Sequence, residues 1–568
     1  MKRKLLPLIS SLALFVPLTG ISAAETGIFL NQIGFPDMAP KTAITNLDSD
    51  TFDVCDAESG AVLFTGKTTP PLYWDMAGES FRRIDFTDFT ENGSYVIRIG
   101  DEHSYPFEIS NDVYESLAVA SMRYFYLNRA SVALPEAFAG AYSRPAGYPD
   151  TEVYIHKSAA SETKPEGFVM SSPKGWFDAG DYNKYIVNSG ITTYTLLCMY
   201  DLYKGHLEGM DLHIPESNNS MPDVLDEIRW NLDWMLTMQD SEDGGVYSKL
   251  STLNFIGFVM PETSTEKRHI FSKSTAATLD FAATMAYASR VYRDYDAAYA
   301  DECLNAAKRA WDWVLLHPDV LFLKNPEGVN TGMYQDADVS DEFEWAAMEL
   351  AISTGDSSYR NHSSEKRDAY TVPCWPMVEL LPRYSAALDL QDASAISDVL
   401  SLADSLVAKR NANIALNPMD RKALEWGSNG NAANMGMLML IAYQLTEKTV
   451  YLETAQDILD YILGRNPLNI CYVTGFGEKS PLYPHHRLSH ADGVDAPYPG
   501  MLVGGANWAK QDGAQCKGYP ESDAPAMCYS DELGSYASNE VAINWSAPFA
   551  FLVNGINAVD AEQSKTKE

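Results

Sequence analysis

Two periodicities of apolar residues divide the chain. Between residue 25 and about residue 110, short apolar runs alternate with Gly, Asp, Asn and Pro. Runs of this length and spacing are typical of the strands of a small β-sandwich. The pattern therefore predicts an all-β N-terminal domain. Its expected strands cover residues 28–30, 52–54, 81–86, 94–99 and 105–109.

From about residue 112 the apolar period becomes that of an α-helix. In residues 222–239, the apolar side chains fall on one helical face, and Pro222 stands where a first-turn proline is tolerated. About eleven such helices, joined in places by long loops, predict an α/α toroid that carries its functional loops at one end. The other expected helices cover residues 115–129, 190–204, 275–293, 300–315, 342–354, 377–390, 396–409, 432–445, 450–463 and 537–557.

Length and charge narrow the class of protein. With 568 residues, the chain is long enough for two or more domains. Its net charge of −35 disfavours nucleic acid and anionic membranes as partners, because their phosphates require Lys and Arg. A neutral polymer or oligomer fits this charge and a cationic one stays open, although solubility is the commoner reason for an acidic surface.

The first 24 residues have the pattern of a secretory signal peptide. Three basic residues precede an apolar run, and small residues at 22–24 suit a cleavage site. No later segment is long and apolar enough to predict a membrane span. We therefore expect a secreted or periplasmic protein. The seven Cys do not form a disulfide framework, although Cys516 and Cys528 share a loop and could pair.

Two carboxylates lie three residues apart in Asp178-Ala179-Gly180-Asp181. Ala179 and Gly180 cannot shield the acids, and Gly180 allows a turn that points both toward one place. Asp and Gly are also ordinary turn residues, so a simple turn is one interpretation. A site that activates a water molecule is the other, because holding two like charges together is otherwise unfavourable.

Two further clusters carry candidate chemistry. Residues 531–540 end in Glu540, directly before an apolar helical pattern. This acid either favours the start of a helix or acts as a proton donor at the mouth of the toroid. Residues 485–490 hold three His and an Arg. They could bind zinc, hydrogen-bond a polyol or form a plain surface loop, and no familiar zinc spacing is present.

Together with other motifs, these clusters closely resemble glycoside hydrolase family nine, the inverting β-1,4-glucanases, in the subgroup with an N-terminal immunoglobulin-like domain. The resemblance covers essentially the whole mature chain. It departs at Tyr148, Ser248, Cys471 and Ser546, which puts the substrate preference in doubt. The other motifs that carry it lie at residues 31–35, 214–217, 222–227, 426–429, 463–467, 473–477 and 499–505.

The resemblance implies a fold and a role for each matching residue. It implies an immunoglobulin-like sandwich over residues 25–111 and an (α/α)6 catalytic toroid over residues 112–568. Asp181 matches the general base, Asp178 the acid that helps to hold the water, and Glu540 the general acid. A pair that contacts the sugar matches His485 and Arg487, and a supporting pair matches Asp531 and Tyr536. In inverting enzymes the two catalytic carboxyls lie roughly 6.5–9.5 Å apart.

An acidic segment offers a candidate metal site. Four carboxylates in seven residues suit calcium, which prefers oxygen ligands, and the family often carries calcium in the matching loop. An acidic helix N-terminus is the alternative. We expect a structural calcium, since acid–base hydrolysis needs no metal. The predicted ligands are Asp336, Asp338, Asp341 and Glu342.

Aromatic residues in or near these loops could stack on sugar rings. The candidates are Trp176, Tyr182, Trp375, Trp426 and Tyr536.

We therefore predict a monomeric enzyme that hydrolyses β-1,4-glucosidic bonds in cellulose, related β-glucans or cellodextrins with inversion. Two alternatives stay open at this point: an exo-acting β-glucosaminidase that cleaves chitosan oligomers, and a non-catalytic glucan-binding protein.

Overall fold

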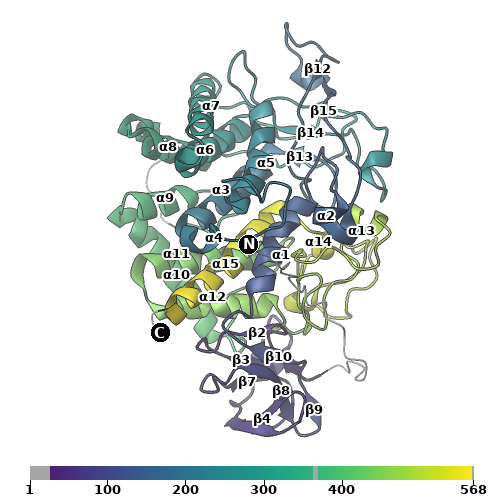
Figure 1. Ribbon diagram of the computed structural model, residues 1–568, viewed down its shortest axis with the longest axis vertical. Helices are drawn as coiled ribbons and strands as arrows, with labels where there is room; N and C mark the ends of the chain where they lie inside the picture. Colours follow the sequence, from purple (N-terminus) through teal and green to yellow (C-terminus); the bar gives the residue numbers. More distant parts are fainter. Residues whose placement is uncertain (1–25, 363–366, 368, 566–568) are drawn as a thin grey trace, which may run out of the picture.

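The computed structural model describes residues 26–362, 367 and 369–565, and the predicted signal peptide lies outside them. An all-β domain forms one end of the molecule, and a much larger helical domain forms the rest (Figure 1). The predicted boundary between residues 111 and 112 falls in the short connection between the last strand of the β domain and the first helix. No helix within the described ranges is long and apolar enough to cross a membrane.

The N-terminal domain is a sandwich of two sheets. One sheet has the strand order β1-β3-β7-β6, and the other has the order β2-β10-β8-β4-β5 with β9 paired to β8. Along β8, Tyr95, Ile97 and Ile99 are buried while alternate residues face outward, as a half-buried strand requires. The strands are β1 (Ile28–Phe29), β2 (Gly34–Phe35), β3 (Thr42–Thr45), β4 (Thr51–Asp56), β5 (Val62–Lys67), β6 (Leu72–Trp74), β7 (Glu79–Asp85), β8 (Gly93–Ile99), β9 (Glu102–His103) and β10 (Phe107–Ile109).

The helical domain confirms the predicted (α/α)6 toroid. Helices α3, α6 and α11 are buried on almost every side, whereas α7 and α10 each keep an exposed face. This contrast is that of an inner and an outer layer of helices. The long helices are α1 (Glu115–Leu127), α3 (Ile186–Leu202), α5 (Asp223–Thr237), α6 (Thr275–Val291), α7 (Ala297–Leu316), α8 (Ser340–Thr354), α9 (Leu381–Asp389), α10 (Ala393–Ala412), α11 (Ser428–Thr446), α12 (Thr449–Ile462) and α15 (Ile543–Lys565).

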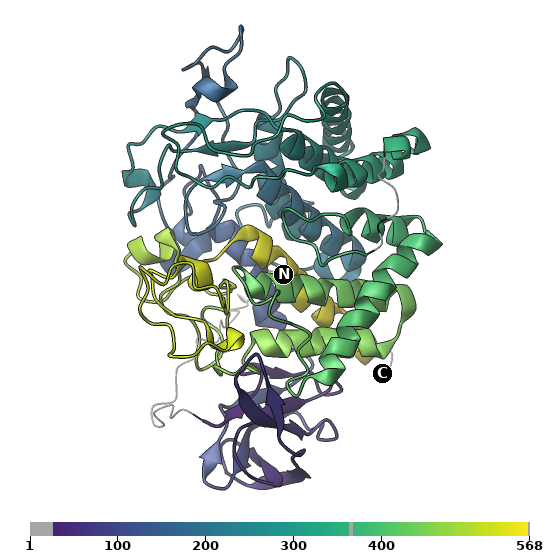
Figure 2. The ribbon, with the colours of Figure 1, turned by 180° about the vertical axis from the view of Figure 1, so that it is seen from behind.

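Short elements gather with the long loops on one side of the helical domain (Figures 1 and 2). A small sheet of order β12-β11-β15-β14-β13 supports these loops, and its strand β13 directly follows the Asp178–Asp181 segment. The short elements on this side are α2 (Glu136–Ala139), β11 (Val153–Ile155), β12 (Val169–Met170), β13 (Lys184–Tyr185), β14 (Lys249–Ser251), β15 (His269–Ile270), α13 (Arg487–Ala491) and α14 (Tyr536–Asn539), whereas α4 (Lys204–Leu207) follows the other end of α3.

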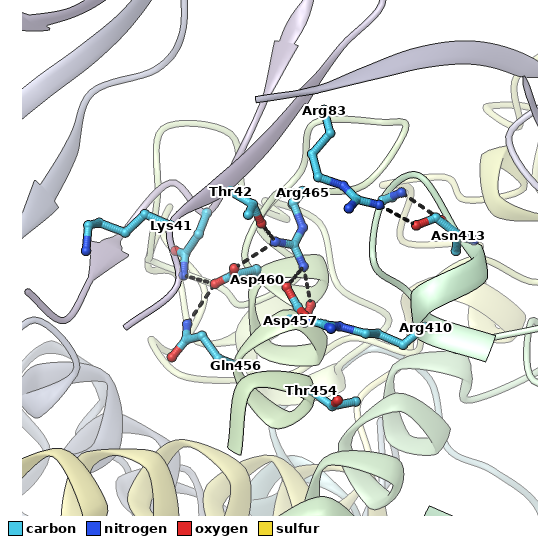
Figure 3. A network of polar contacts seen from close by, with 12 residues as sticks. Lys41, Thr42, Arg83, Arg410, Asn413, Thr454, Gln456, Asp457, Asp460 and Arg465 are labelled. Carbon is cyan, nitrogen blue, oxygen red and sulfur yellow. Dashed lines mark hydrogen bonds and ion pairs between the residues drawn. The ribbon is translucent and has the colours of Figure 1, made fainter. Parts of the chain in front are cut away.

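A buried polar network joins the two domains (Figure 3). Arg465 of the helical domain forms ion pairs with Asp457 at 2.7 Å and Asp460 at 3.0 Å, and it contacts Thr42 of the sandwich. The side-chain amide of Asn31, also in the sandwich, donates to Asp460 at 3.0 Å. Because these side chains are all buried, the sandwich is fixed to the toroid by specific bonds as well as by apolar packing.

Two expectations differ from the structure. The helix expected over residues 537–557 is divided into α14 and α15, and Glu540 lies between them in an extended conformation. Pairing with the segment around His485 explains the interruption. Cys516 and Cys528 do not pair: both are free, and their thiols contact different oxygen atoms.

Candidate active site

Backbone contacts bring the three predicted clusters together. The carbonyl of Gly180 accepts hydrogen bonds from the backbone N–H of Arg487 at 3.0 Å and from its guanidinium at 2.7 Å. His485 pairs with Glu540 in a parallel β-bridge, and the backbone N–H of Ile543 donates to the carbonyl of Asp178 at 2.9 Å. The fold therefore joins segments that lie more than 350 residues apart in the sequence.

Gly180 is required for this approach. A Cβ atom at this position would lie 2.0 Å from the carbonyl oxygen of His485, which no side chain could tolerate. The glycine between the two aspartates thus does more than allow a turn: it lets the His485 segment lie directly against the loop that carries both acids.

Asp178 is buried and held by two donors. The hydroxyl of Tyr334 donates to its Oδ2 at 2.6 Å, and the amide of Asn188 donates to its Oδ1 at 2.7 Å. Burial, and then the neighbouring charge of Asp181, raise the pKa of Asp178 to about 8. Tyr334 and Asn188 were not identified as site residues from the sequence, because neither belongs to an acidic or His-rich cluster.

Asp181 is buried in a more cationic environment. The side-chain amide of Asn183 donates to its Oδ2 at 2.7 Å. Burial raises the pKa of Asp181, and the positive charge of Arg487, the bonds from Asn183 and the charge of Arg268 act in the opposite direction. Asp181 is therefore the aspartate of the pair whose ionised form has cationic support.

Glu540 is partly exposed beside this pair. Burial, and then the charge of Asp181, raise its pKa to about 8, while Arg487 acts in the opposite direction. A carboxyl group with this pKa is largely protonated at neutral pH. Glu540 therefore has the protonation state of a proton donor, and Asp181 has the environment of a proton acceptor.

His485 and Arg487 belong to the same site as the three acids. The Nδ1–H of His485 donates to the carbonyl of Leu533 at 2.6 Å, which leaves Nε2 as an acceptor. Burial lowers the pKa of His485 to about 4, so the ring is neutral at neutral pH. Phe258 packs edge-on against His485 at 5.2 Å and beneath the Arg487 guanidinium at 5.1 Å. Phe258 was not predicted, since a lone Phe in a loop carries no distinctive signal.

Asp531 lies beneath the His loop. Its carboxylate accepts hydrogen bonds from the backbone N–H groups of Leu482 and Tyr483 and from the amide of Asn539. These bonds leave it few free lone pairs. The structure therefore gives Asp531 a supporting position, next to the segment that presents His485.

Two of the predicted aromatic residues form an accessible pair. Trp426 is 41% exposed, and its ring lies 5.2 Å from that of Tyr536, which in turn lies 6.1 Å from His485. Trp375 is partly buried and packs edge-on against Tyr334, the residue that holds Asp178. Through His485 and Tyr334, these rings adjoin the segments that carry the three acids.

Two other aromatic residues do not have the accessibility that stacking requires. Tyr182 is 3% exposed, and its hydroxyl donates to the carbonyl of Val259. Trp176 is fully buried, and its indole N–H donates to Glu227. Both side chains are buried in the core, so the expectation that they stack on sugar is corrected.

The acidic segment, residues 336–342, is more buried than its sequence indicated. Asp338 is exposed, and its carboxylate accepts from the backbone N–H of Ser340. Glu342 is 1% exposed, and both of its carboxylate oxygens lack a hydrogen-bond partner. One oxygen of Asp280, on α6, and one of Asp336 are buried and unpartnered as well. Asp280 was missed because it lies inside an apolar helical pattern.

These acids influence one another. Burial raises the pKa of Glu342 well above its ordinary value, and the charges of Asp280, Asp341 and Asp336 act in the same direction. Unpartnered buried carboxylates suit a hard cation. Within the described residues, however, no three His, Cys, Asp or Glu side chains converge in a metal-binding arrangement.

A helical toroid whose loops bring two buried aspartates together with a glutamate of raised pKa has the acid and base groups of a glycoside hydrolase. Comparison with known proteins identifies the particular family. The model of glycosyl hydrolase family 9 matches residues 114–553, and that of the cellulase N-terminal Ig-like domain matches residues 23–104. The chain belongs to glycosyl hydrolase family 9.

Individual relatives are similar over nearly their whole length. The chain is 40% identical over 580 residues to the xyloglucan-specific endo-β-1,4-glucanase BoGH9A of Bacteroides ovatus, covering 96% of this chain and 98% of that protein. It is 34% identical over 561 residues to a cellodextrinase of Butyrivibrio fibrisolvens, covering 93% and 99%. The solved structure of a Bacteroides ovatus family 9 protein superposes with a TM-score of 0.87 at 38% identity, covering 94% and 99%.

Proposed function

We propose that Asp181 and Glu540 carry out β-1,4-glucan hydrolysis in this family 9 enzyme, Asp181 as the general base and Glu540 as the general acid. The observation that carries this proposal is the contrast between the two carboxyl environments. Burial raises the pKa of both groups. At Asp181, Arg487, Asn183 and Arg268 act against burial. At Glu540, the charges of both aspartates add to the effect of burial and Arg487 offsets them only in part, which favours a protonated Glu540.

In this mechanism, Glu540 donates its proton to the glycosidic oxygen as the bond to the anomeric carbon breaks. Asp181 removes a proton from the attacking water, and Asp178, held by Tyr334 and Asn188, fixes that water from the other side. Attack from the face opposite the leaving group inverts the anomeric configuration. His485 and Arg487 are proposed to bind sugar hydroxyls beside the cleaved bond, His485 accepting through Nε2.

We further propose endo-cleavage of soluble β-1,4-glucans, with xyloglucan among the substrates. The support is the similarity to a xyloglucan-specific endo-β-1,4-glucanase and the exposed aromatic pair Trp426 and Tyr536 beside the acids. Aromatic faces of this kind bind sugar rings without requiring a chain end.

The substrate proposal is tested by a product profile on carboxymethyl cellulose, xyloglucan and cellopentaose. Endo-action predicts a rapid fall in viscosity of the polymers with mixed oligomers as products. Release of only glucose or cellobiose from cellopentaose, with unchanged polymer viscosity, would instead make the enzyme a cellodextrinase.

The two alternative functions are not favoured by the comparisons. The similar proteins are named endoglucanases, a cellodextrinase and a cellobiosidase, and all three carboxyl groups are present. Neither a glucosaminidase nor a non-catalytic binding protein is needed to explain the site.

We also propose a structural calcium ion held by Asp280, Asp336, Asp341 and Glu342. The support is the set of buried carboxylate oxygens without a hydrogen-bond partner on Asp280, Asp336 and Glu342. Asp341 lies beside them and its charge helps to raise the pKa of Glu342, although its Oδ2 accepts from the backbone N–H of Val378. The ion would neutralise these charges and fix the loop that follows Tyr334, with no part in the hydrolytic step. Asp338 is left out of the set, because it is exposed and already bonded to Ser340.

Export from the cytoplasm is proposed from the sequence of residues 1–24. Their basic start, apolar middle and small residues support a cleaved signal peptide. N-terminal sequencing of the mature protein from the culture fluid or periplasm tests this, and retention of Met1 in the exported protein would contradict it.

A further inference from the structure

Lys249 is a fully buried lysine near the active site, outside all three catalytic segments. It begins β14 and pairs in register with Tyr185 of β13, the strand that follows the Asp178–Asp181 loop. Burial lowers its pKa to about 7, and the negative charge of Asp181 acts in the opposite direction. A buried lysine is costly to the fold unless it makes bonds that the fold requires.

The ammonium group of Lys249 binds one loop through three neutral oxygens. It donates to the side chain of Asn325 at 2.6 Å, to the hydroxyl of Thr331 at 3.0 Å and to the carbonyl of Gly332 at 2.7 Å. Three donors meeting three acceptors satisfy the full capacity of an ammonium group. The amide of Asn325 also donates to the carbonyl of Thr331, so the loop closes around Lys249.

The same loop carries the hydroxyl that holds Asp178. Tyr334 lies two residues after Gly332 and has a positive φ of 50°, a strained conformation for a residue with a side chain. Its ring packs edge-on against that of Tyr185 at 4.9 Å, and its hydroxyl donates to Asp178 at 2.6 Å. Such a conformation persists only where surrounding contacts fix it. Lys249 supplies such contacts to the residues that precede Tyr334.

We propose that Lys249 is a positioning residue for hydrolysis: by holding residues 325–332, it places the Tyr334 hydroxyl on Asp178 and so fixes the aspartate that holds the water. It does not touch the substrate and acts through Tyr334. This inference rests on the proposed function, because it assumes that the orientation of Asp178 limits the rate.

The test is a double-mutant cycle of Lys249→Met and Tyr334→Phe, with kcat and KM measured on cellopentaose. Lys249→Met removes three hydrogen bonds at nearly constant volume. It should lower kcat about 10- to 100-fold with KM changed less than about threefold, since small displacements of a catalytic group have effects of this size. In the Tyr334→Phe background, the same change should have almost no further effect on kcat, because the contact it serves is already lost.

A matched control is Lys41→Met in the sandwich domain. Lys41 is also fully buried and donates to backbone carbonyls, those of Asp37 and Ala39. Its replacement should leave kcat unchanged at a temperature where the protein is folded. If Lys249→Met does not fold, Asn325→Ala removes one Lys249 bond from a half-buried position and should show a smaller loss of kcat with the same dependence on Tyr334.

The outcomes separate this inference from the function on which it rests. Unchanged kcat in Lys249→Met, or equal fold-losses with and without the Tyr334 hydroxyl, would overturn the role of Lys249 alone. Full activity in both Tyr334→Phe and Asp178→Asn would instead overturn the proposed role of Asp178.

Discussion

At the scale of single residues, three carboxyl groups with similar intrinsic acidity differ in the neighbours that shift their pKa values. Asp181 has cationic support from Arg487 and Arg268, whereas Asp178 has only neutral donors. Glu540 sees mostly burial and negative charge. In the proposed mechanism, the environment, more than the residue type, therefore separates the general base from the general acid.

Asp181→Asn and Glu540→Gln test these roles at nearly constant shape. Each should lower kcat about 10²- to 10⁴-fold, because each removes one partner of general acid–base catalysis. Glu521→Gln, which changes an exposed carboxylate, is the control with unchanged kcat. Turnover at the parent rate in either of the first two variants would refute the assignment of the altered residue.

The pH dependence of kcat/KM has a defined sign. Glu540 acts in its protonated form, so activity should fall as pH rises through about 8. Asp181 acts in its ionised form, and its pKa is raised, so the acid limb should lie above the ordinary range for Asp. A profile measured with cellopentaose that stays flat to about pH 9 would contradict a protonated Glu540.

The sequence identified the site residues that lie together in short motifs, and it missed those that are scattered along the chain. Asp178, Asp181 and Glu540 lie in recognisable motifs, and the structure joins them. Tyr334 and Asp280 lie far from these motifs and were not predicted, because their positions depend on packing between distant segments. Tyr182 was expected to face a sugar but is 3% exposed, since polarity patterns do not show which way a loop aromatic points.

At the scale of elements, loops and short strands rather than long helices position the acids of the site. The small sheet β11–β15 fixes the Asp178–Asp181 loop, and the interruption between α14 and α15 presents Glu540. Apart from α15, the long helices were predicted within a few residues from their apolar period. Several strands were not predicted, because two-residue strands such as β2 are too short to show an alternation of apolar and polar residues.

If the loop before α8 binds calcium as proposed, the thermal stability of the enzyme should depend on calcium. Removal of calcium with EDTA should lower the Tm, and saturating calcium at about 100 times its Kd should restore about 2.7 kcal/mol of stability. Glu342→Gln should abolish this response, whereas Asp338→Asn, which alters an exposed acid of the same loop, should retain it. A Tm that is insensitive to EDTA and calcium in the parent enzyme would contradict the proposed ion.

At the scale of the whole molecule, the sandwich is part of the hydrolase rather than an appendage to it. Beyond the Arg465 network, Arg83 of the sandwich donates to the carbonyls of Asn413 and Ile414 in the toroid. Apolar sandwich residues such as Phe29 and Trp74 belong to the core of the helical domain. Sequence patterns separated the two domains but could not show this shared interior, which depends on contacts across more than 300 residues.

Arg465→Met should destabilise the protein by about 3–5 kcal/mol, because Asp460 would lose its cation while staying buried. Arg293→Met, which removes an exposed ion pair with Asp301, should cost at most about 1 kcal/mol. Thermal or denaturant unfolding of the full chain measures both. Equal stability of the two variants would show that the buried Arg465 network contributes no more to stability than an exposed ion pair.

The central claim is hydrolysis of a β-1,4-glucan with inversion by Asp181 and Glu540. The most direct test is ¹H NMR of cellopentaose during the first minutes of hydrolysis, before mutarotation equilibrates the products. The mechanism predicts that α-anomers form first at the newly released reducing ends. Initial formation of β-anomers would contradict it, because retention requires a covalent intermediate rather than direct attack of water.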